Sequence, residues 1–177
     1  MTMRKILLAG FLATAFTATT HAAEAPAATA PVFMSAEWAK QACDAWNQDP
    51  VLTDKLKEEW VKNHGGKGHK VMQIYREGCE SSPRIEMHVS EKDGKAMCVY
   101  GGAVKTTELS KKHDYLMWAK DKHWQRMGDG TDGPMKAMMF GRLNFKGPKM
   151  EAMGNMGPFG NFLKLTGKID SDRSKCP

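Results

Sequence analysis

The feature that most constrains the fold of this chain is an Asp-Gly pair between two segments of alternating character. Asp93-Gly94 is a strong signal for a two-residue β-hairpin turn, because both residues tolerate positive φ. Residues 84–89 before it alternate between polar and apolar side chains, which predicts a strand with one buried face. Residues 96–100 are predicted to return as its partner. The sequence therefore predicts an antiparallel sheet.

Helical periodicity is found on both sides of this hairpin. Ser35 is predicted to cap a first helix with two tryptophans on its apolar face, and Asp49-Pro50 is predicted to begin a second with Leu52 and Trp60 inward. One further predicted helix covers residues 120–127, and three more begin near Pro134, Pro148 and Pro158. The other predicted strands lie at residues 72–74, 114–119 and 141–146. This order predicts an α+β fold whose sheet is covered on one face.

The N-terminal segment has the three-part pattern of a secretory signal peptide. Arg4 and Lys5 precede an apolar run that is too short for an ordinary transmembrane helix, and small residues follow it. The predicted organisation is a signal peptide over residues 1–23, a flexible leader over 24–34, one domain over 35–170 and a C-terminal tail over 171–177. Such a signal predicts a periplasmic or secreted protein.

The charge of the exported segment argues against nucleic acid as a partner. Export would remove two of the 26 Lys and Arg residues and none of the 20 Asp and Glu residues, which leaves a formal charge of +4. No basic run stands out. This mild balance suits a transient contact with an anionic membrane surface, and equally an ordinary protein surface.

No catalytic motif is present in the sequence. It lacks a G-x-S-x-G nucleophile elbow, a P-loop, a G-x-G-x-x-G turn and an H-E-x-x-H zinc motif. The histidines beyond the predicted signal peptide are interpreted as surface residues: His64, His69, His88, His113 and His123. A lipid-modifying hydrolase is therefore disfavoured, and no cofactor is predicted.

Methionine is unusually frequent in the C-terminal half. Twelve methionines follow residue 23, and seven of them lie from Met127 to Met156. Three interpretations are open. Methionine fills irregular cores, it lines apolar pockets that re-pack around different ligands, and its thioether suits Cu(I). The interspersed phenylalanines and the lack of a dense Met/His tract weigh against copper.

Four cysteines follow the predicted signal peptide, and an even number in an oxidising compartment predicts two disulfides. Cys79 lies just before one predicted strand and Cys98 lies inside the next, so we expect Cys79–Cys98 within one meander. Cys43–Cys176 would then tie the first helix to the tail. No C-x-x-C pair is present, which argues against a zinc ribbon or a thioredoxin-type site.

A glycine-bounded segment, Gly141-Arg-Leu-Asn-Phe-Lys-Gly147, lies between two predicted helices. Together with the strand and helix that begin at residue 114, it resembles the sterol carrier protein type 2 (sterol-transfer) family, whose pattern is helix, Gly-Lys-Leu-x-Ile-x-Gly, helix. The upstream elements follow the family's order. The resemblance implies a five-stranded, mostly antiparallel sheet covered by helices, with an apolar tunnel between sheet and helices.

A member of this family is expected to bind an apolar lipid, such as a sterol, hopanoid, fatty acyl chain or phospholipid, without chemistry. We expect this protein to be a monomer. The residues that the resemblance places at pocket positions are Trp124, Met127, Met138, Met139, Phe140, Met153, Met156, Phe159, Phe162 and Leu163. The Gly- and Pro-rich segment 147–167 is expected to act as a movable lid. The alternatives are a Met-rich copper-binding protein and a ligand-free accessory module to a partner enzyme.

Overall fold

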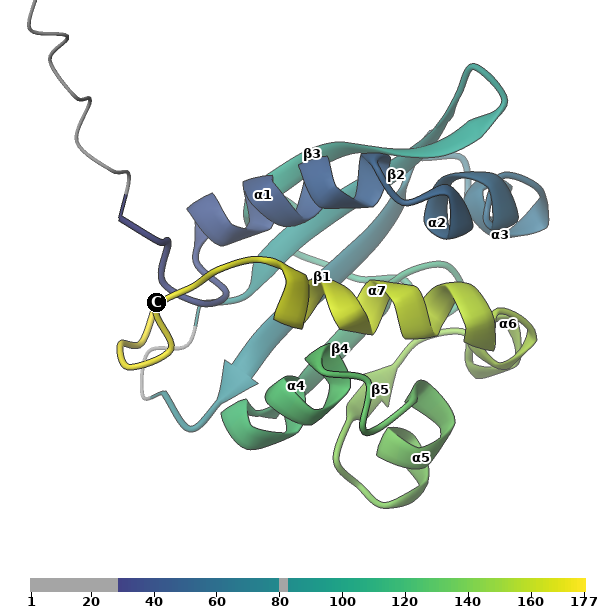
Figure 1. Cartoon of the computed structure of the whole chain (residues 1–177). Helices are drawn as coiled ribbons and strands as arrows, with labels where there is room; N and C mark the ends of the chain where they lie inside the picture. Colours follow the sequence, from purple (N-terminus) through teal and green to yellow (C-terminus); the bar gives the residue numbers. More distant parts are fainter. Residues whose placement is uncertain (1–28, 80–82) are drawn as a thin grey trace, which may run out of the picture.

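The computed structural model describes residues 29–79 and 83–177, so the predicted signal peptide lies outside the described residues. A layer of helices covers one face of a five-stranded sheet (Figure 1). The elements of the first half are α1 (Ala36–Asn47), α2 (Pro50–Lys55), α3 (Glu59–Lys62), β1 (Lys70–Glu77), β2 (Ile85–Lys92) and β3 (Lys95–Ala103). Those of the second half are β4 (Tyr115–Lys120), α4 (Asp121–Gly128), α5 (Pro134–Met139), β5 (Asn144–Lys146), α6 (Lys149–Gly154) and α7 (Met156–Lys168).

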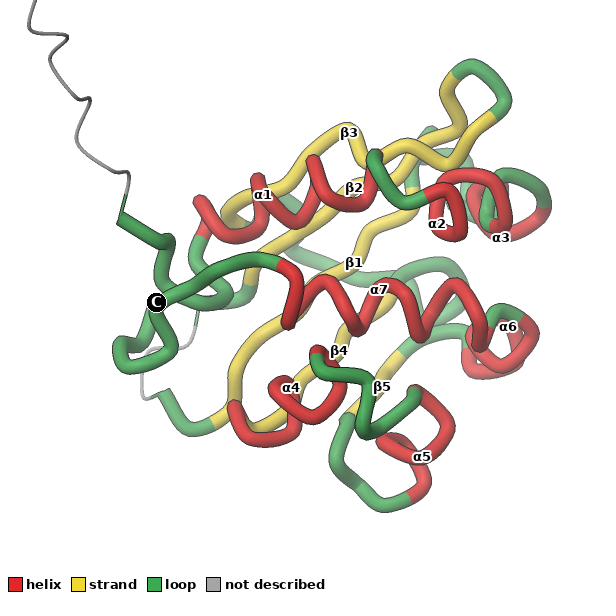
Figure 2. Tube along the Cα trace, viewed as in Figure 1, coloured by secondary structure: helices red, strands yellow, loops and turns green. Residues whose placement is uncertain are grey.

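The sheet is mostly antiparallel and has the strand order β3-β2-β1-β4-β5 (Figure 2). β1 pairs antiparallel with β2 and parallel with β4, and the short β5 closes the other edge. The β2–β3 turn has positive φ at Asp93 (52°) and Gly94 (70°), which is the geometry that the Asp-Gly pair predicts. The predicted α+β fold and its five-stranded sheet are confirmed.

The helix-facing side of the sheet is apolar along most of its length. Ile74, Ile85 and Met87 face the helices and are fully buried. α7 lies across the middle of this face and crosses α4 closely, because Gly128 and Gly167 meet without side chains. A Cβ atom on Gly128 would lie 2.6 Å from the backbone nitrogen of Gly167, so the crossing requires glycine.

Two local predictions differ from the structure. The predicted second helix is divided into α2 and α3, although Leu52, Leu56 and Trp60 are buried together as their spacing indicates. Glu86, predicted to face solvent, is fully buried on the far side of the sheet. Burial alone would raise the pKa of Glu86, but hydrogen bonds from His88 and other neighbours outweigh it and lower the pKa below its usual value.

The predicted disulfide pairing is wrong. The structure pairs Cys43 with Cys98 and Cys79 with Cys176, at Cα–Cα distances of 5.3 and 5.6 Å. Cys43 meets Cys98 because α1 packs directly on β3, where Gly101 leaves room for the helix backbone. Cys79 follows β1, and β2 separates β1 from β3 in the sheet, so closeness in sequence does not bring Cys79 to Cys98.

Ordered packing extends beyond both predicted domain boundaries. Phe33, assigned to the leader, is fully buried and lies 3.6 Å from the guanidinium of Arg173, measured to the ring centroid. Val32 forms a parallel bridge with Asp172, which was assigned to the tail. The start of the described chain and its C-terminus therefore lie side by side (Figure 1). Within the described residues, no helix is both long enough and apolar enough to cross a membrane.

Candidate functional site

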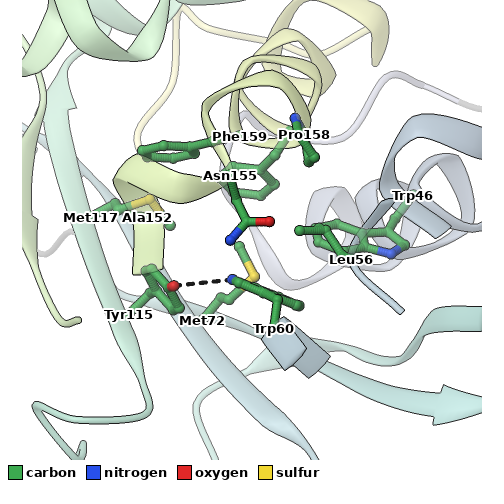
Figure 3. Close-up of a pocket in the computed structure, with 11 residues that line it drawn as sticks. Trp46, Leu56, Trp60, Met72, Tyr115, Met117, Ala152, Asn155, Pro158 and Phe159 are labelled. Carbon is green, nitrogen blue, oxygen red and sulfur yellow. Dashed lines mark hydrogen bonds between the residues drawn. The ribbon is translucent and has the colours of Figure 1, made fainter. Parts of the chain in front are cut away.

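An apolar cavity of about 30 Å³ lies between the sheet and the helices (Figure 3). Its lining comes from both layers: Trp46, Leu56, Trp60, Met72, Tyr115, Met117, Ala152, Asn155, Pro158, Phe159 and Phe162. Aromatic rings fill most of the space, since Trp46 lies 6.0 Å from both Trp60 and Phe162 between ring centroids. The remaining volume has room for about two water molecules. The expected tunnel is therefore narrowed here to a small cavity.

A larger apolar groove opens at the surface beside this cavity. It has a volume of about 400 Å³ and is lined by Met135, Met138, Met139, Gly141, Leu143, Asn144, Phe145, Lys149, Ala152 and Met153. Ala152 of α6 lines both spaces. The ring of Phe145 on the groove side lies 6.1 Å from the ring of Phe159 on the cavity side. One side chain of α6 and two aromatic rings thus separate the cavity from the groove; we call this groove the methionine groove.

α6 also borders a second, more polar groove of about 810 Å³. Met150, Glu151 and Gly154 of α6 line it, together with Trp60 and residues of α2 and α3. Trp60 lines the cavity as well. α6 therefore contributes side chains to the cavity and to both grooves.

Glu151 attaches α6 to a buried polar cluster. Lys70 lies on the helix-facing side of β1, and its ammonium is 2.5 Å from Glu151 Oε1 and 2.9 Å from the carbonyl oxygen of Asn63. The hydroxyl of Tyr115 donates to the same carboxylate oxygen, and the side-chain amide of Asn63 donates to the other. Trp60 Nε1 donates to the Tyr115 hydroxyl at 3.0 Å (Figure 3). The Glu151 carboxylate thus accepts from three different side chains.

The electrostatics of this cluster favour a negative group at the position of Glu151. Burial lowers the pKa of Lys70, and the hydrogen bond and charge of Glu151 oppose that effect. Burial and the hydrogen bond to Glu151 raise the pKa of Tyr115 far above its usual value, so its phenol stays protonated and donates. The rings of Trp60 and Tyr115 each lie 5.1 Å from the Lys70 ammonium and stabilise it further.

The residues predicted to bind lipid occupy different places in the structure. Phe159 and Phe162 line the cavity, whereas Met138, Met139 and Met153 line the methionine groove. The first group thus faces the cavity and the second faces the groove, and Ala152 of α6 lines both spaces.

The other five predicted residues line neither space. Trp124, Met127 and Leu163 are fully buried in the core. Phe140 is 63% exposed, and Met156 is half-buried. A role for these residues in ligand binding stays a prediction.

Sequence reasoning missed the contribution of the N-terminal half. The helical spacing of Trp46, Leu56 and Trp60 predicts core positions and gives no sign of the cavity beneath them. A signal for Lys70 was available: it occupies an inward position in the alternating run that continues with Met72. A charged side chain at such a position requires a buried partner.

Comparisons with known proteins agree with this architecture. A family model described as the SCP-2 sterol transfer family matches residues 52–160, which include most of the cavity lining. A crystal structure of sterol carrier protein 2 is similar at a TM-score of 0.52 and 16% identity, over 77% of this chain and 98% of that one. This likeness shows the shared fold.

Two further solved structures are similar at lower scores. A solution structure of a conserved hypothetical protein from Thermus thermophilus, described as possibly sterol carrier protein, has a TM-score of 0.48 and 17% identity over 78% of this chain and 90% of that one. A UbiJ-SCP2 ubiquinone synthesis protein has a TM-score of 0.41 and 13% identity over 74% and 93%. No curated protein sequence matches the chain.

Proposed function

We propose, because the chain belongs to the SCP-2 sterol transfer family, that this protein binds an apolar lipid and carries it without chemistry. The observation that carries the proposal is the apolar cavity between sheet and helices, with the methionine groove directly behind Ala152. Displacing α6 would join the cavity of about 30 Å³ to the groove of about 400 Å³. Burying a lipid chain there would contribute about 25 cal/mol per Å² of apolar surface.

The proposed place of action is the periplasm or the cell exterior. Two disulfides suit an oxidising compartment, and they support the predicted signal peptide over residues 1–23. Met139, Phe140 and Met150 are exposed around α5 and α6, close to the groove. Exposed apolar side chains beside a ligand site suit a transient contact with a membrane surface. We propose that the protein acts as a monomer.

Native mass spectrometry and lipid titration test this function. Protein purified from its own host should carry a bound lipid mass, and a panel of sterols, fatty acids and phospholipids should include binders of the delipidated protein. Trp46 and Trp60 line the cavity, so a ligand there should change the intrinsic tryptophan fluorescence. No co-purified lipid and no binding across the panel would contradict lipid carriage.

Cu(I) is the second candidate ligand, because four thioethers line one groove: Met135, Met138, Met139 and Met153. Among the residues that the structure describes, no group of three or more His, Cys, Asp or Glu residues is placed to hold a metal ion, so copper would depend on these methionines. Competition with a chromophoric Cu(I) chelator decides between the two ligands. Copper would be favoured if the protein binds Cu(I) tightly, Met→Leu variants lose this affinity, and no lipid binds. Binding of neither would favour a ligand-free accessory module.

A further inference from the structure

The Lys70 ammonium lies at the border between the apolar cavity and α6. The rings of Trp60 and Tyr115, each 5.1 Å from the ammonium, also line the cavity. Met72, two residues further along the same face of β1, lines it too. A buried cation with hydrogen-bond donors beside it thus stands at the edge of an apolar space.

α6 is the weakly held part of the helical layer. It has six residues and no side-chain cap at its N-terminus, and Ala152 is its buried residue. The side chain of Asn155 donates to the carbonyl oxygen of Glu151 at its C-terminal end, at 2.8 Å. A helix this short is not stable on its own, so its position depends on Ala152 and on the hydrogen bonds of Glu151 and Asn155. α7 differs, because Phe162, Leu163 and Leu165 bury it in the core. The expected lid over residues 147–167 therefore narrows to α6.

Displacing α6 would leave the Lys70 ammonium without its counterion and the Tyr115 hydroxyl without an acceptor. An unpaired buried charge strongly destabilises a protein, so a neutral ligand would have to compensate that loss. A ligand that carries its own carboxylate would restore the same contacts while its chain fills the cavity.

We infer that Glu151 occupies the position of a ligand carboxylate, and that the ligand is a long-chain carboxylate with Lys70 as its counterion. This inference rests on the proposed lipid-binding function and narrows its ligand class. Tyr115 supplies the second donor to the carboxylate, and Asn63 supplies a third. Glu151 itself is the competitor that the ligand displaces.

The test compares two ligands with the same chain, dodecanoate and 1-dodecanol, by tryptophan fluorescence on delipidated protein. In the wild-type protein, dodecanoate should bind at least about 10-fold more tightly than dodecanol, because only the carboxylate replaces Glu151. Lys70→Met should bring the ratio of the two affinities close to one, because dodecanoate loses its counterion and dodecanol no longer leaves a charge unpaired. Lys95→Met is the matched control, since Lys95 pairs with Asp54 at the surface, and it should leave the ratio unchanged.

Glu151→Gln tests whether Glu151 competes with the ligand or contacts it. If Glu151 competes, each ligand displaces a neutral side chain in this variant, so dodecanoate and dodecanol should both bind more tightly by the same factor. The ratio of their affinities should then equal that of the wild type. Glu91→Gln is the matched control, because Glu91 pairs with Lys62 at the surface, and it should change neither affinity. If Lys70→Met does not fold, Tyr115→Phe keeps the test open, because loss of one donor should lower the ratio several-fold.

The outcomes separate this inference from the proposed function. A wild-type ratio close to one, a ratio that survives Lys70→Met or Tyr115→Phe, or weaker acid binding in Glu151→Gln would overturn the carboxylate site and leave lipid carriage standing. Failure of both ligands to bind either the wild type or Glu151→Gln, with no other lipid bound, would overturn the proposed function and this inference with it.

Discussion

Replacing Glu151 alone should destabilise the ligand-free protein more than replacing Lys70 and Glu151 together. The variants are Lys70→Met, Glu151→Leu and the double variant. Methionine keeps the length of the lysine stem, and leucine fills much of the glutamate volume without charge. A buried pair of this kind stabilises little in total, but a single buried charge without its partner is costly.

The burial of the two side chains sets the expected magnitudes. The side chain of Lys70 is 0% exposed and that of Glu151 is 16% exposed. Glu151→Leu leaves the ammonium without a counterion, with the Asn63 carbonyl and the rings of Trp60 and Tyr115 beside it, at a cost of about 3–5 kcal/mol. Lys70→Met leaves a carboxylate that keeps neutral donors and some water, at a cost of about 1–3 kcal/mol. The double variant removes both charges and leaves the Tyr115 hydroxyl without its acceptor, at a cost of about 1–3 kcal/mol.

Urea unfolding of delipidated, oxidised protein, followed by far-UV circular dichroism, measures these differences. The coupling between the two changes should be about 3–5 kcal/mol, whereas the exposed pair of Lys62 and Glu91 should give less than about 1 kcal/mol. A double variant that loses the full sum of the single losses would refute the argument that an unpaired charge causes them. Equal denaturant slopes across the series are required for the comparison.

Three further predictions concern other parts of the fold. Replacing both Cys79 and Cys176 by alanine should lower the free energy of unfolding in urea by up to about 4–5 kcal/mol, because their disulfide spans 97 residues. An unchanged urea midpoint would argue against this disulfide. Gly128→Ala should lower the melting temperature, because its Cβ would lie 2.6 Å from a backbone nitrogen of α7, and an unchanged melting temperature would show that the helices can separate there. The hydrogen bond from Ser174, together with further neighbours, lowers the pKa of Asp172 from 3.8 to about 2. The stability that this carboxylate contributes should therefore be present above pH 4 and lost as the pH falls towards 2. Asp172→Asn should remove that part of the acid dependence, measured as urea midpoints between pH 4 and pH 2.

Local signals predicted the secondary structure well. The Asp93-Gly94 turn, the alternation around Met87 and the caps at Ser35 and Asp49 act over a few residues, and each is found where the sequence places it. Ser35 accepts from the backbone nitrogen of Trp38 at 3.2 Å, as an N-cap should. Such features need no knowledge of the rest of the chain.

The disulfides and the cavity could not be predicted in the same way, because they depend on which elements meet. Cys43 reaches Cys98 because α1 lies on β3, and the parallel pairing of β1 with β4 places Met72 opposite Tyr115. The resemblance is most specific in the C-terminal half and places residues such as Trp124 at pocket positions, whereas the structure buries Trp124 in the core. The sequence does not reveal the role of Lys70, because its partner lies 81 residues away on α6.

The interleaved disulfides have a consequence for how the protein is made. In chain order, the first cysteine pairs with the third and the second with the fourth, so every bond between consecutive cysteines is non-native. In a chain synthesised from its N-terminus, Cys43 and Cys79 are available to each other before Cys98 is. A bond formed between them at that stage would have to be corrected by thiol–disulfide exchange. The reduced protein should therefore regain its native bonds faster with a disulfide isomerase than with an oxidant alone, and equal rates would show that α1 docks on β3 before any cysteine oxidises. The native pairing thus predicts that maturation of this chain requires isomerisation as well as oxidation.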